Sequence, residues 1–256
     1  MNLSRPNHPA LDEIIYLETV DSTNLEAHRR RSEFPAQNIL FISEEQTAGK
    51  GQHGRQWEST AGLGLWMTLL LGRPLDLEHN LQLLSLYCGI VIQETIASLT
   101  TINTTLKWPN DIMIGSQKCG GILTEIQWHG SSPKTAIIGV GLNVHHGLAD
   151  FPSSIRDTAI SLGMVGWKEA NQEQIVERIL HYFFSGIDRL NQPIGLAKAW
   201  NIHAFKLNEL VWWNDGSDTI EGKFLGVNQR GEAQIQIQNT IKSYGSGEIH
   251  LVKFNS

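Results

Sequence analysis

Cysteine and long apolar runs are both scarce in this chain. It has only two cysteines, Cys88 and Cys119, in 256 residues, so a disulfide-stabilised secreted scaffold is excluded. The longest apolar stretch, residues 81–99, is interrupted by polar and acidic side chains. It is therefore expected to form a buried helix rather than a membrane span. No signal peptide is recognisable either, and we expect a cytoplasmic protein.

A surplus of basic residues is also missing. Lysine and arginine number 20 against 26 aspartates and glutamates, which gives a formal net charge of −6. A general nucleic-acid binder needs a cationic surface to replace phosphate counterions, so this balance argues against DNA as a partner. The one basic run, Arg29–Arg31, is expected on a solvated helix face. A hydrophobic fraction of 41% without low-complexity tracts is typical of a soluble globular protein.

Hydrophobic patterning predicts an α+β fold. Apolar periodicity predicts helices, and short apolar runs bounded by turn residues predict strands. Expected helices cover about 21–31, 77–99, 171–190 and 196–205, and expected strands cover 14–17, 39–43, 63–71, 104–108, 112–114, 119–128 and 135–144. From Leu210 the pattern changes to short strands and turns, which predicts a small all-β module. We therefore expect a mixed-sheet domain packed with helices at 1–207 and a small β-barrel domain at 208–256.

The stretch Ser43–Trp57 is rich in glycine and carries two cations. Three of its glycines lie between positions 49 and 54, beside Lys50 and Arg55. Closely spaced glycines let successive backbone N–H groups turn toward one anion, and the cations suit phosphate or carboxylate. A flexible surface loop is the alternative, and it stays open. The stretch is neither a Walker loop nor a dinucleotide fingerprint, because it lacks the Gly-Lys-Ser/Thr ending and does not open a helix.

Further motifs follow along the chain. Residues 107–111 read Lys-Trp-Pro-Asn-Asp, and residues 118–125 read Lys-Cys-Gly-Gly-Ile-Leu-Thr-Glu. Residues 21–24 read Asp-Ser-Thr-Asn, and residues 139–143 read Gly-Val-Gly-Leu-Asn. In order and rough spacing, these motifs and the glycine-rich loop resemble those of the biotin protein ligases. The resemblance extends from about position 11 to about position 253.

The resemblance implies a class II synthetase-like catalytic domain of the biotin/lipoate ligase superfamily and a small Src-homology-like C-terminal barrel. It implies a ligase that uses ATP and Mg²⁺ to form biotinyl-5′-AMP and then transfers biotin to a lysine of a biotin carboxyl carrier protein. Because the motifs begin at Asp21, the chain resembles the enzyme-only form, without the N-terminal helix-turn-helix domain of repressor members. No membrane partner is implied, and monomer and homodimer both stay open.

The resemblance also assigns roles to individual residues. The expected catalytic cations, which neutralise the carboxylate and α-phosphate as they converge, are Lys118, Arg55 and Lys50. Expected biotin contacts are Ser22, Thr23, Asn24, Gln46, Gly49, Lys50, Trp57, Lys118 and Gly120, with Leu65 and Trp66 as walls of the slot. Expected ATP and adenylate contacts are Lys50, Gln52, His53, Arg55, Trp57, Lys107, Trp108, Asn110 and Asn143, and Asp111 is the expected Mg²⁺ ligand.

Structural alternatives stay open at several of these positions. Lys118 is otherwise an ordinary hairpin lysine, and Ser22 and Thr23 are equally suited to capping a helix. Trp108 is otherwise a core residue, and the Asn-Asp pair at 110–111 a local turn motif.

Three features are interpreted as structural. The pair His145–His146 has no further ligands at useful spacing, so a polar loop is favoured over a metal site. Cys119 has no base partner and is expected to fill the core. In Trp212–Trp213 the two rings lie on opposite strand faces, so one is expected to meet the main domain or the carrier protein.

The glycine-rich loop departs from the pattern of the family it resembles. That pattern is Gly-Arg-Gly-Arg-x-Gly-Arg, whereas this chain reads Gly-Lys-Gly-Gln-His-Gly-Arg at 49–55. Gln52 removes the charge that helps the family retain the adenylate, so we hypothesise weaker retention of biotinyl-5′-AMP here. Two other functions were weighed: a lipoate- or octanoate-transferring relative, and a non-catalytic biotin-binding protein, against which the presence of Lys118 and Asp111 speaks.

Overall fold

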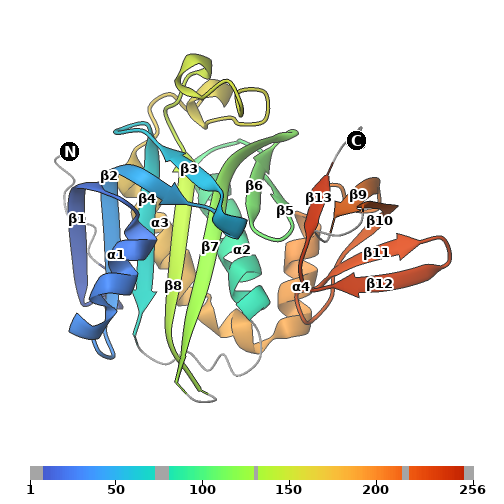
Figure 1. The fold of residues 1–256 in the computed structure, drawn as a ribbon, viewed down its shortest axis with the longest axis horizontal. Coiled ribbons are helices and arrows are strands. Elements are labelled where there is room, and N and C mark those ends of the chain that lie inside the picture. Colours follow the sequence, from blue (N-terminus) through green and yellow to red (C-terminus); the bar gives the residue numbers. More distant parts are fainter. Residues whose placement is uncertain (1–7, 73–80, 130–131, 215–218, 251–256) are drawn as a thin grey trace.

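The computed structural model describes residues 8–72, 81–129, 132–214 and 219–250 (Figure 1). A mixed eight-stranded sheet forms its larger part, in the order β1-β2-β4-β8-β7-β6-β5, with β3 added on β2. The strands are β1 (Glu13–Val20), β2 (Asn38–Lys50), β3 (Gln56–Ser59), β4 (Gly64–Leu71), β5 (Thr105–Lys107), β6 (Asp111–Ile114), β7 (Gln117–His129) and β8 (Ser132–Asn143). Only the β1–β2 pairing is parallel among these described strands.

Helices cover both faces of this sheet. The short helix α1 (Thr23–Arg30) packs on one face against β2, β4 and β8, while α2 (Leu81–Leu99), α3 (Gln172–Ser185) and α4 (Pro193–Ile202) lie on the other (Figure 1). Cover on both faces explains why the apolar run of β4 is buried at every position. None of the described helices is both long and apolar enough to cross a membrane.

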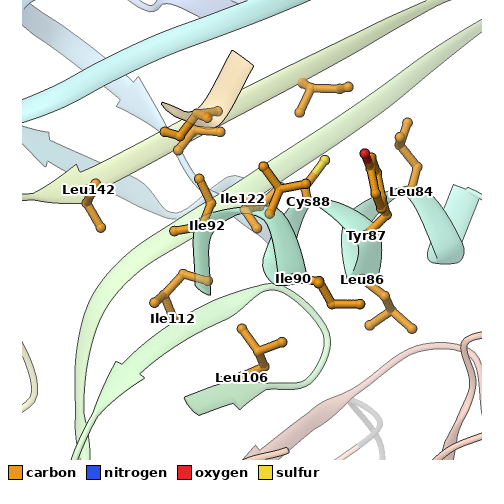
Figure 2. Close-up of a cluster of buried hydrophobic side chains, with 14 of the residues drawn as sticks. Leu84, Leu86, Tyr87, Cys88, Ile90, Ile92, Leu106, Ile112, Ile122 and Leu142 are labelled. Atoms are coloured by element: carbon orange, nitrogen blue, oxygen red, sulfur yellow. The ribbon is translucent and has the colours of Figure 1, made fainter. Parts of the chain in front are cut away.

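Helix α2 forms the centre of the core. It is apolar around most of its circumference, as expected of a helix enclosed on all sides. Figure 2 shows its side chains beside Ile112, Ile122 and Leu142 from the strands. The interrupted apolar stretch at 81–99 was therefore correctly interpreted as a buried helix, while its predicted first turn at 77–80 lies outside the described residues.

The C-terminal part forms a second sheet of five antiparallel strands, in the order β12-β11-β10-β9-β13. The strands are β9 (Leu210–Asn214), β10 (Thr219–Val227), β11 (Ala233–Ile237), β12 (Thr240–Tyr244) and β13 (Glu248–His250). The indole N–H of Trp108 donates to the Gly231 carbonyl at 2.9 Å, and its ring lies 5.2 Å from that of Trp213. Trp213 is fully buried. Its ring therefore meets the main domain, which is one of the two contacts expected for a ring of the Trp212–Trp213 pair.

Several predicted boundaries differ from the structure for local reasons. Strand β2 extends to Lys50, so the first half of the glycine-rich stretch is strand rather than loop. Helix α3 ends at Ser185, because Gly186 follows and a 3-10 turn at 187–191 replaces the predicted last turn. Helix α4 begins at Pro193, since proline is well placed in a first helical turn, and it ends at Ile202. The division of the chain at 207/208 stays a prediction.

Candidate active site

A cavity of about 280 Å³ lies between the glycine-rich loop, strands β7 and β8, the start of α1 and the β5–β6 turn. Most predicted site residues line it, namely Ser22, Thr23, Asn24, Gln46, Lys50, Gln52, Arg55, Trp57, Lys107, Trp108, Asn110, Asp111, Lys118 and Asn143. Motifs up to about 120 residues apart in the sequence therefore meet at one place. The fold brings them together because β4 alone separates β2 from the adjacent pair β8 and β7, and α1 packs across β2, β4 and β8 (Figure 1).

Besides Leu65 and Trp66, three predicted site residues do not line this cavity. A Cβ atom at Gly49 would lie 2.5 Å from the Trp57 carbonyl oxygen, so this glycine allows β2 and β3 to approach each other. Gly120 is buried against Leu142. His53 has a left-handed backbone (φ 56°) at the exposed tip of the loop. Gly49 and His53 instead line a second cavity of about 720 Å³, which shares Lys50, Gln52 and Arg55 with the first. A direct ligand contact of Gly49, Gly120 and His53 stays a prediction.

One end of the cavity is polar and tightly bonded. The Gln46 carbonyl oxygen Oε1 accepts the Thr23 backbone N–H at 2.8 Å, and Gln46 Nε2 donates to Ser59 Oγ at 2.8 Å. Ser22 stands at the N-cap position of α1, but its side chain makes no capping hydrogen bond. Ser22 therefore occupies the capping position, but its hydroxyl does not cap the helix. This end offers short polar groups of fixed orientation to a ligand.

The floor of the cavity is made of glycine, and Trp57 lies on it. Gly121 and Gly141 face each other across β7 and β8. A Cβ at Gly141 would lie 2.6 Å from the Trp57 indole nitrogen Nε1, and one at Gly121 would lie 3.1 Å from the ring. Larger residues here would displace the indole. Its Nε1 is buried without a hydrogen-bond partner among the described residues, so a donor remains available at the floor.

The Trp57 ring also meets Trp66, edge to face, with ring centroids 6.4 Å apart. Trp66 is fully buried, and Leu65 is nearly so. Neither residue lines the cavity, so they support its wall from behind, and a contact with the ligand stays a prediction.

Cations gather at the other end of the cavity. Lys118 Nζ lies 2.6 Å from Asp111 Oδ1 and 5.1 Å from the centroid of the Trp57 ring. Burial lowers the pKa of Lys107, against the attraction of Asp111 and together with the repulsion of Lys118 and Arg55. Such a concentration of positive charge is costly when no anion is bound, and it favours an anionic ligand.

Two of the groups around these cations were missed by the sequence reasoning. Arg55 forms an ion pair with Glu248 of β13, so the C-terminal sheet contributes a carboxylate to the cavity. The segment after β8 supplies the other group: the Lys118 backbone N–H donates to the Thr158 carbonyl at 2.7 Å, and the Ile160 N–H donates to the Lys118 carbonyl at 3.0 Å. The backbone of Lys118 is thereby held on both sides.

The same segment closes one side of the cavity with Phe151, Ile155, Thr158 and Ala159. It contains no glycine-rich run, charge cluster or regular periodicity. The apolar residues Phe151 and Ile155 in an otherwise irregular stretch were the only available signal.

Three polar or aromatic residues of the predicted ATP site make structural contacts here. Asn110 Nδ2 donates to the Ile122 carbonyl at 2.6 Å, and Asn143 Nδ2 donates to the Ile160 carbonyl at 3.1 Å. Trp108 is buried and bonded to the C-terminal sheet. These contacts favour the structural alternatives for the Trp108 ring and the Asn110 amide, although all three residues border the cavity.

Of the residues interpreted as structural, Cys119 lies in the core as expected, whereas His146 lies in apolar surroundings and not in a polar loop. Cys119 is fully buried, and burial raises the pKa of its thiol to about 12, so it carries no thiolate at neutral pH. His146 is buried and stacks on Phe151. Over the described residues, no group of three His, Cys, Asp or Glu side chains is placed to hold a metal ion.

Comparison with known proteins identifies the family. The model of the biotin/lipoate A/B protein ligase family matches residues 16–143. The bifunctional ligase/repressor BirA of Bacillus subtilis is 31% identical over 249 residues, which cover 93% of this chain and 74% of that protein. The chain belongs to the biotin/lipoate A/B protein ligase family.

Other members of this family extend the comparison. A biotin–[acetyl-CoA-carboxylase] ligase of Paracoccus denitrificans is 26% identical, covering 84% of this chain and 90% of its own. The structure of the Aquifex aeolicus biotin protein ligase with biotin and ATP superposes with a TM-score of 0.80 at 28% identity, covering 95% of this chain and all of that one. These findings confirm the predicted family, the two-part fold and the class of enzyme.

Proposed function

We propose that this chain is an ATP-dependent biotin–protein ligase, which forms biotinyl-5′-AMP and transfers biotin to a lysine of a biotin carboxyl carrier protein. The observation that carries the proposal is the polarity of the cavity. Oriented neutral groups, Thr23 and Gln46, lie at one end, and Lys107, Lys118 and Arg55 lie at the other. A ligand with an uncharged hydrogen-bonding ring and an anionic tail matches this arrangement.

The cations explain how the first step proceeds. A carboxylate oxygen of biotin forms a bond to the α-phosphorus of ATP, and the bond from that phosphorus to pyrophosphate breaks. Two anions must approach each other, and Lys118 stands where their charges are neutralised. Its backbone is held by Thr158 and Ile160, and its ammonium is paired with Asp111 at 2.6 Å, so the side chain is oriented before substrates arrive. In the second step the carrier amine attacks the acyl carbon, loses a proton, and AMP leaves.

Asp111 is the residue that would hold Mg²⁺ beside the phosphates. Magnesium bound with ATP commonly takes only one or two protein carboxylates, and phosphate oxygens and water complete its shell. Asp111 borders the cavity next to Lys118, so a single carboxylate is present where this chemistry needs one. The ion would supply further charge neutralisation.

Two more predictions accompany this function. The 207/208 division is supported by the separate hydrogen-bonded sheet that the C-terminal strands form, although its buried residues Phe224, Ile235 and Ile249 continue the core of the larger sheet. A cytoplasmic location, and a monomer or a homodimer, stay predictions.

The proposal is tested by pyrophosphate release from Mg-ATP with biotin or lipoate, followed by mass analysis of an added biotin carboxyl carrier domain. We expect biotin-dependent release and one modified carrier lysine. Lys118→Met should lower the rate about a hundredfold or more, while Lys198→Met, at an exposed site on α4, should not. Release with lipoate instead would favour the lipoate-transferring alternative, and biotin binding without any release would leave a non-catalytic biotin-binding protein.

A further inference from the structure

A buried chain of hydrogen bonds connects the surface to the polar end of the cavity. Asn24 Nδ2 donates to Glu125 Oε2 at 3.0 Å, across 101 positions of sequence. The Thr68 hydroxyl lies 2.7 Å from Asn24 Oδ1 and 2.7 Å from the Thr23 hydroxyl. The Thr23 hydroxyl in turn lies 3.1 Å from Gln46 Oε1. Thr23, Asn24 and Thr68 are all buried, and Thr68 is fully so, so the hydrogen bonds of the Thr68 hydroxyl cannot be replaced by bonds to water.

The number of hydrogens fixes their direction. The three contacts between Asn24, Thr68, Thr23 and Gln46 involve two hydroxyls and therefore only two hydrogens. Contacts of 2.7 Å are ordinary for O–H···O bonds, and two bare oxygens would repel at this distance, so the short contacts take both hydrogens. Thr68 then donates to Asn24, and Thr23 donates to Thr68. The longest contact, between Thr23 Oγ1 and Gln46 Oε1 at 3.1 Å, has hydrogen-bond geometry, but this assignment leaves it without a hydrogen.

Both ends of the chain enforce this direction. An ionised carboxylate only accepts hydrogen bonds, so Glu125 holds the Asn24 amide with its NH₂ outward and its oxygen toward Thr68. Gly139 leaves room for this amide, since a Cβ there would lie 2.1 Å from Asn24 Oδ1. At the other end Gln46 is oriented because its NH₂ donates to Ser59.

We infer that Glu125 is a positioning residue for biotin recognition: through Asn24 and Thr68 it keeps the Thr23 hydrogen away from the cavity. Thr23 Oγ1 and Gln46 Oε1 then form an acceptor pair, two oxygens 3.1 Å apart with no hydrogen between them. A ligand N–H relieves the repulsion within such a pair, and the ureido ring of biotin carries two N–H groups. A carbonyl at the same place is rejected. The inference rests on the proposed function and explains how the biotin site selects the ureido ring.

Variants that redirect the Thr23 hydrogen test this inference. In Glu125→Lys the new ammonium donates, the Asn24 amide turns over, and Thr23 donates to Gln46. In Thr68→Val the acceptor for the Thr23 hydrogen is lost, with the same consequence. Each should weaken biotin binding about tenfold, the scale of one hydrogen bond. The double variant should lose little more, because both changes act through one chain.

Two controls separate polarity from charge and from general damage. Glu125→Gln keeps an acceptor for Asn24, so its affinity should stay within about threefold of the wild type. Glu33→Lys makes the same charge reversal at an exposed ion pair with Arg30, outside the chain of hydrogen bonds, and should bind biotin normally. Thermal unfolding of each variant reports whether it is folded.

The measurement is calorimetric titration with biotin and with two lactam analogues, each with one ureido N–H replaced by CH₂. One of the two analogues lacks the N–H that meets the acceptor pair. The wild type, Glu125→Lys and Thr68→Val should therefore bind this analogue with equal affinity. A folded Glu125→Lys protein that keeps the wild-type preference for biotin over both analogues overturns the inference alone. If the wild type binds no biotin, the proposed function fails as well, and the two failures are thereby distinguished.

Discussion

His146 provides a test of how this core responds to pH. Its side chain is 2% exposed, and neither ring nitrogen has a hydrogen-bond partner among the described residues. The ring stacks on Phe151 with centroids 4.8 Å apart and meets the edge of Trp66 at 5.9 Å. Burial in these apolar surroundings lowers the pKa of His146 from 6.5 to about 4. A charged imidazolium is therefore strongly disfavoured in the folded protein.

The sign and size of the effect follow from this pKa. Between the folded value and the unfolded value, the unfolded chain binds more protons, so stability falls as the pH falls from 6.5 through 4. His146 lowers the free energy of unfolding by about 2 kcal/mol at pH 5 and by at most about 3 kcal/mol below pH 4, because each pH unit between the two pKa values contributes about 1.4 kcal/mol. Above pH 6.5 the two states bind protons equally and His146 has no effect.

The variant His146→Phe isolates this contribution, because phenylalanine retains a flat ring that can stack on Phe151. Urea unfolding at pH 7 and pH 5 gives the free energy of unfolding of both proteins. The variant should lose about 2 kcal/mol less than the wild type between these values, while other titrating groups cancel in the comparison. His181→Asn, at an exposed position of α3, should behave like the wild type. Equal losses in wild type and His146→Phe would refute the reasoning.

Other predictions concern the floor of the cavity, the loop and the thiols. Gly141→Ala places a methyl group 2.6 Å from the Trp57 indole nitrogen. This variant should lose about 1–3 kcal/mol of stability in urea unfolding and bind biotin more weakly. By contrast, Gly195→Ala in α4, where the nearest atom is 3.8 Å away, should stabilise the protein by about 0.5–1 kcal/mol in the same unfolding assay. Gln52→Arg should reduce pyrophosphate release in the absence of carrier and the stray acylation of lysines, and unchanged release would contradict a role for this position in retaining the adenylate. Cys88 and Cys119 should react with a thiol reagent only on unfolding, because burial raises the pKa of both thiols.

Local patterns were sufficient for most elements and for the motifs at the cavity. The apolar run of β4 and the one-sided face of α3 depend on neighbours a few residues away, and both appear as predicted. The glycine-rich stretch was assigned correctly to the cavity, but its first half is the end of β2. That error is physical: pairing with β1, β3 and β4 supplies backbone hydrogen bonds that extend the strand through residues of low intrinsic strand preference.

Contacts between distant segments were not accessible in this way. Glu125 bonds to Asn24 only because β8 and α1 bring β7 and the first motif together, and nothing around position 125 in the sequence signals a partner near position 24. The same holds for the segment containing Phe151 and Thr158, whose role depends on where the chain returns after β8. Trp108 shows that one residue can serve both purposes, since it belongs to a motif at the cavity and also fills the contact with the C-terminal sheet.

Two of the cations that line the cavity are paired before any substrate arrives. Lys118 pairs with Asp111, and Arg55 pairs with Glu248. The Arg55 side chain is exposed and Lys118 is half-buried, so substrate binding takes both further from water, and each then exchanges a carboxylate for a phosphate or for the biotin carboxylate. Each exchange also frees a carboxylate, and Asp111 is freed at the place where Mg²⁺ would be held. Glu248 lies outside residues 16–143 matched by the family model. The charge balance of the site therefore depends on the C-terminal sheet, although the motifs that define the family lie in the larger one.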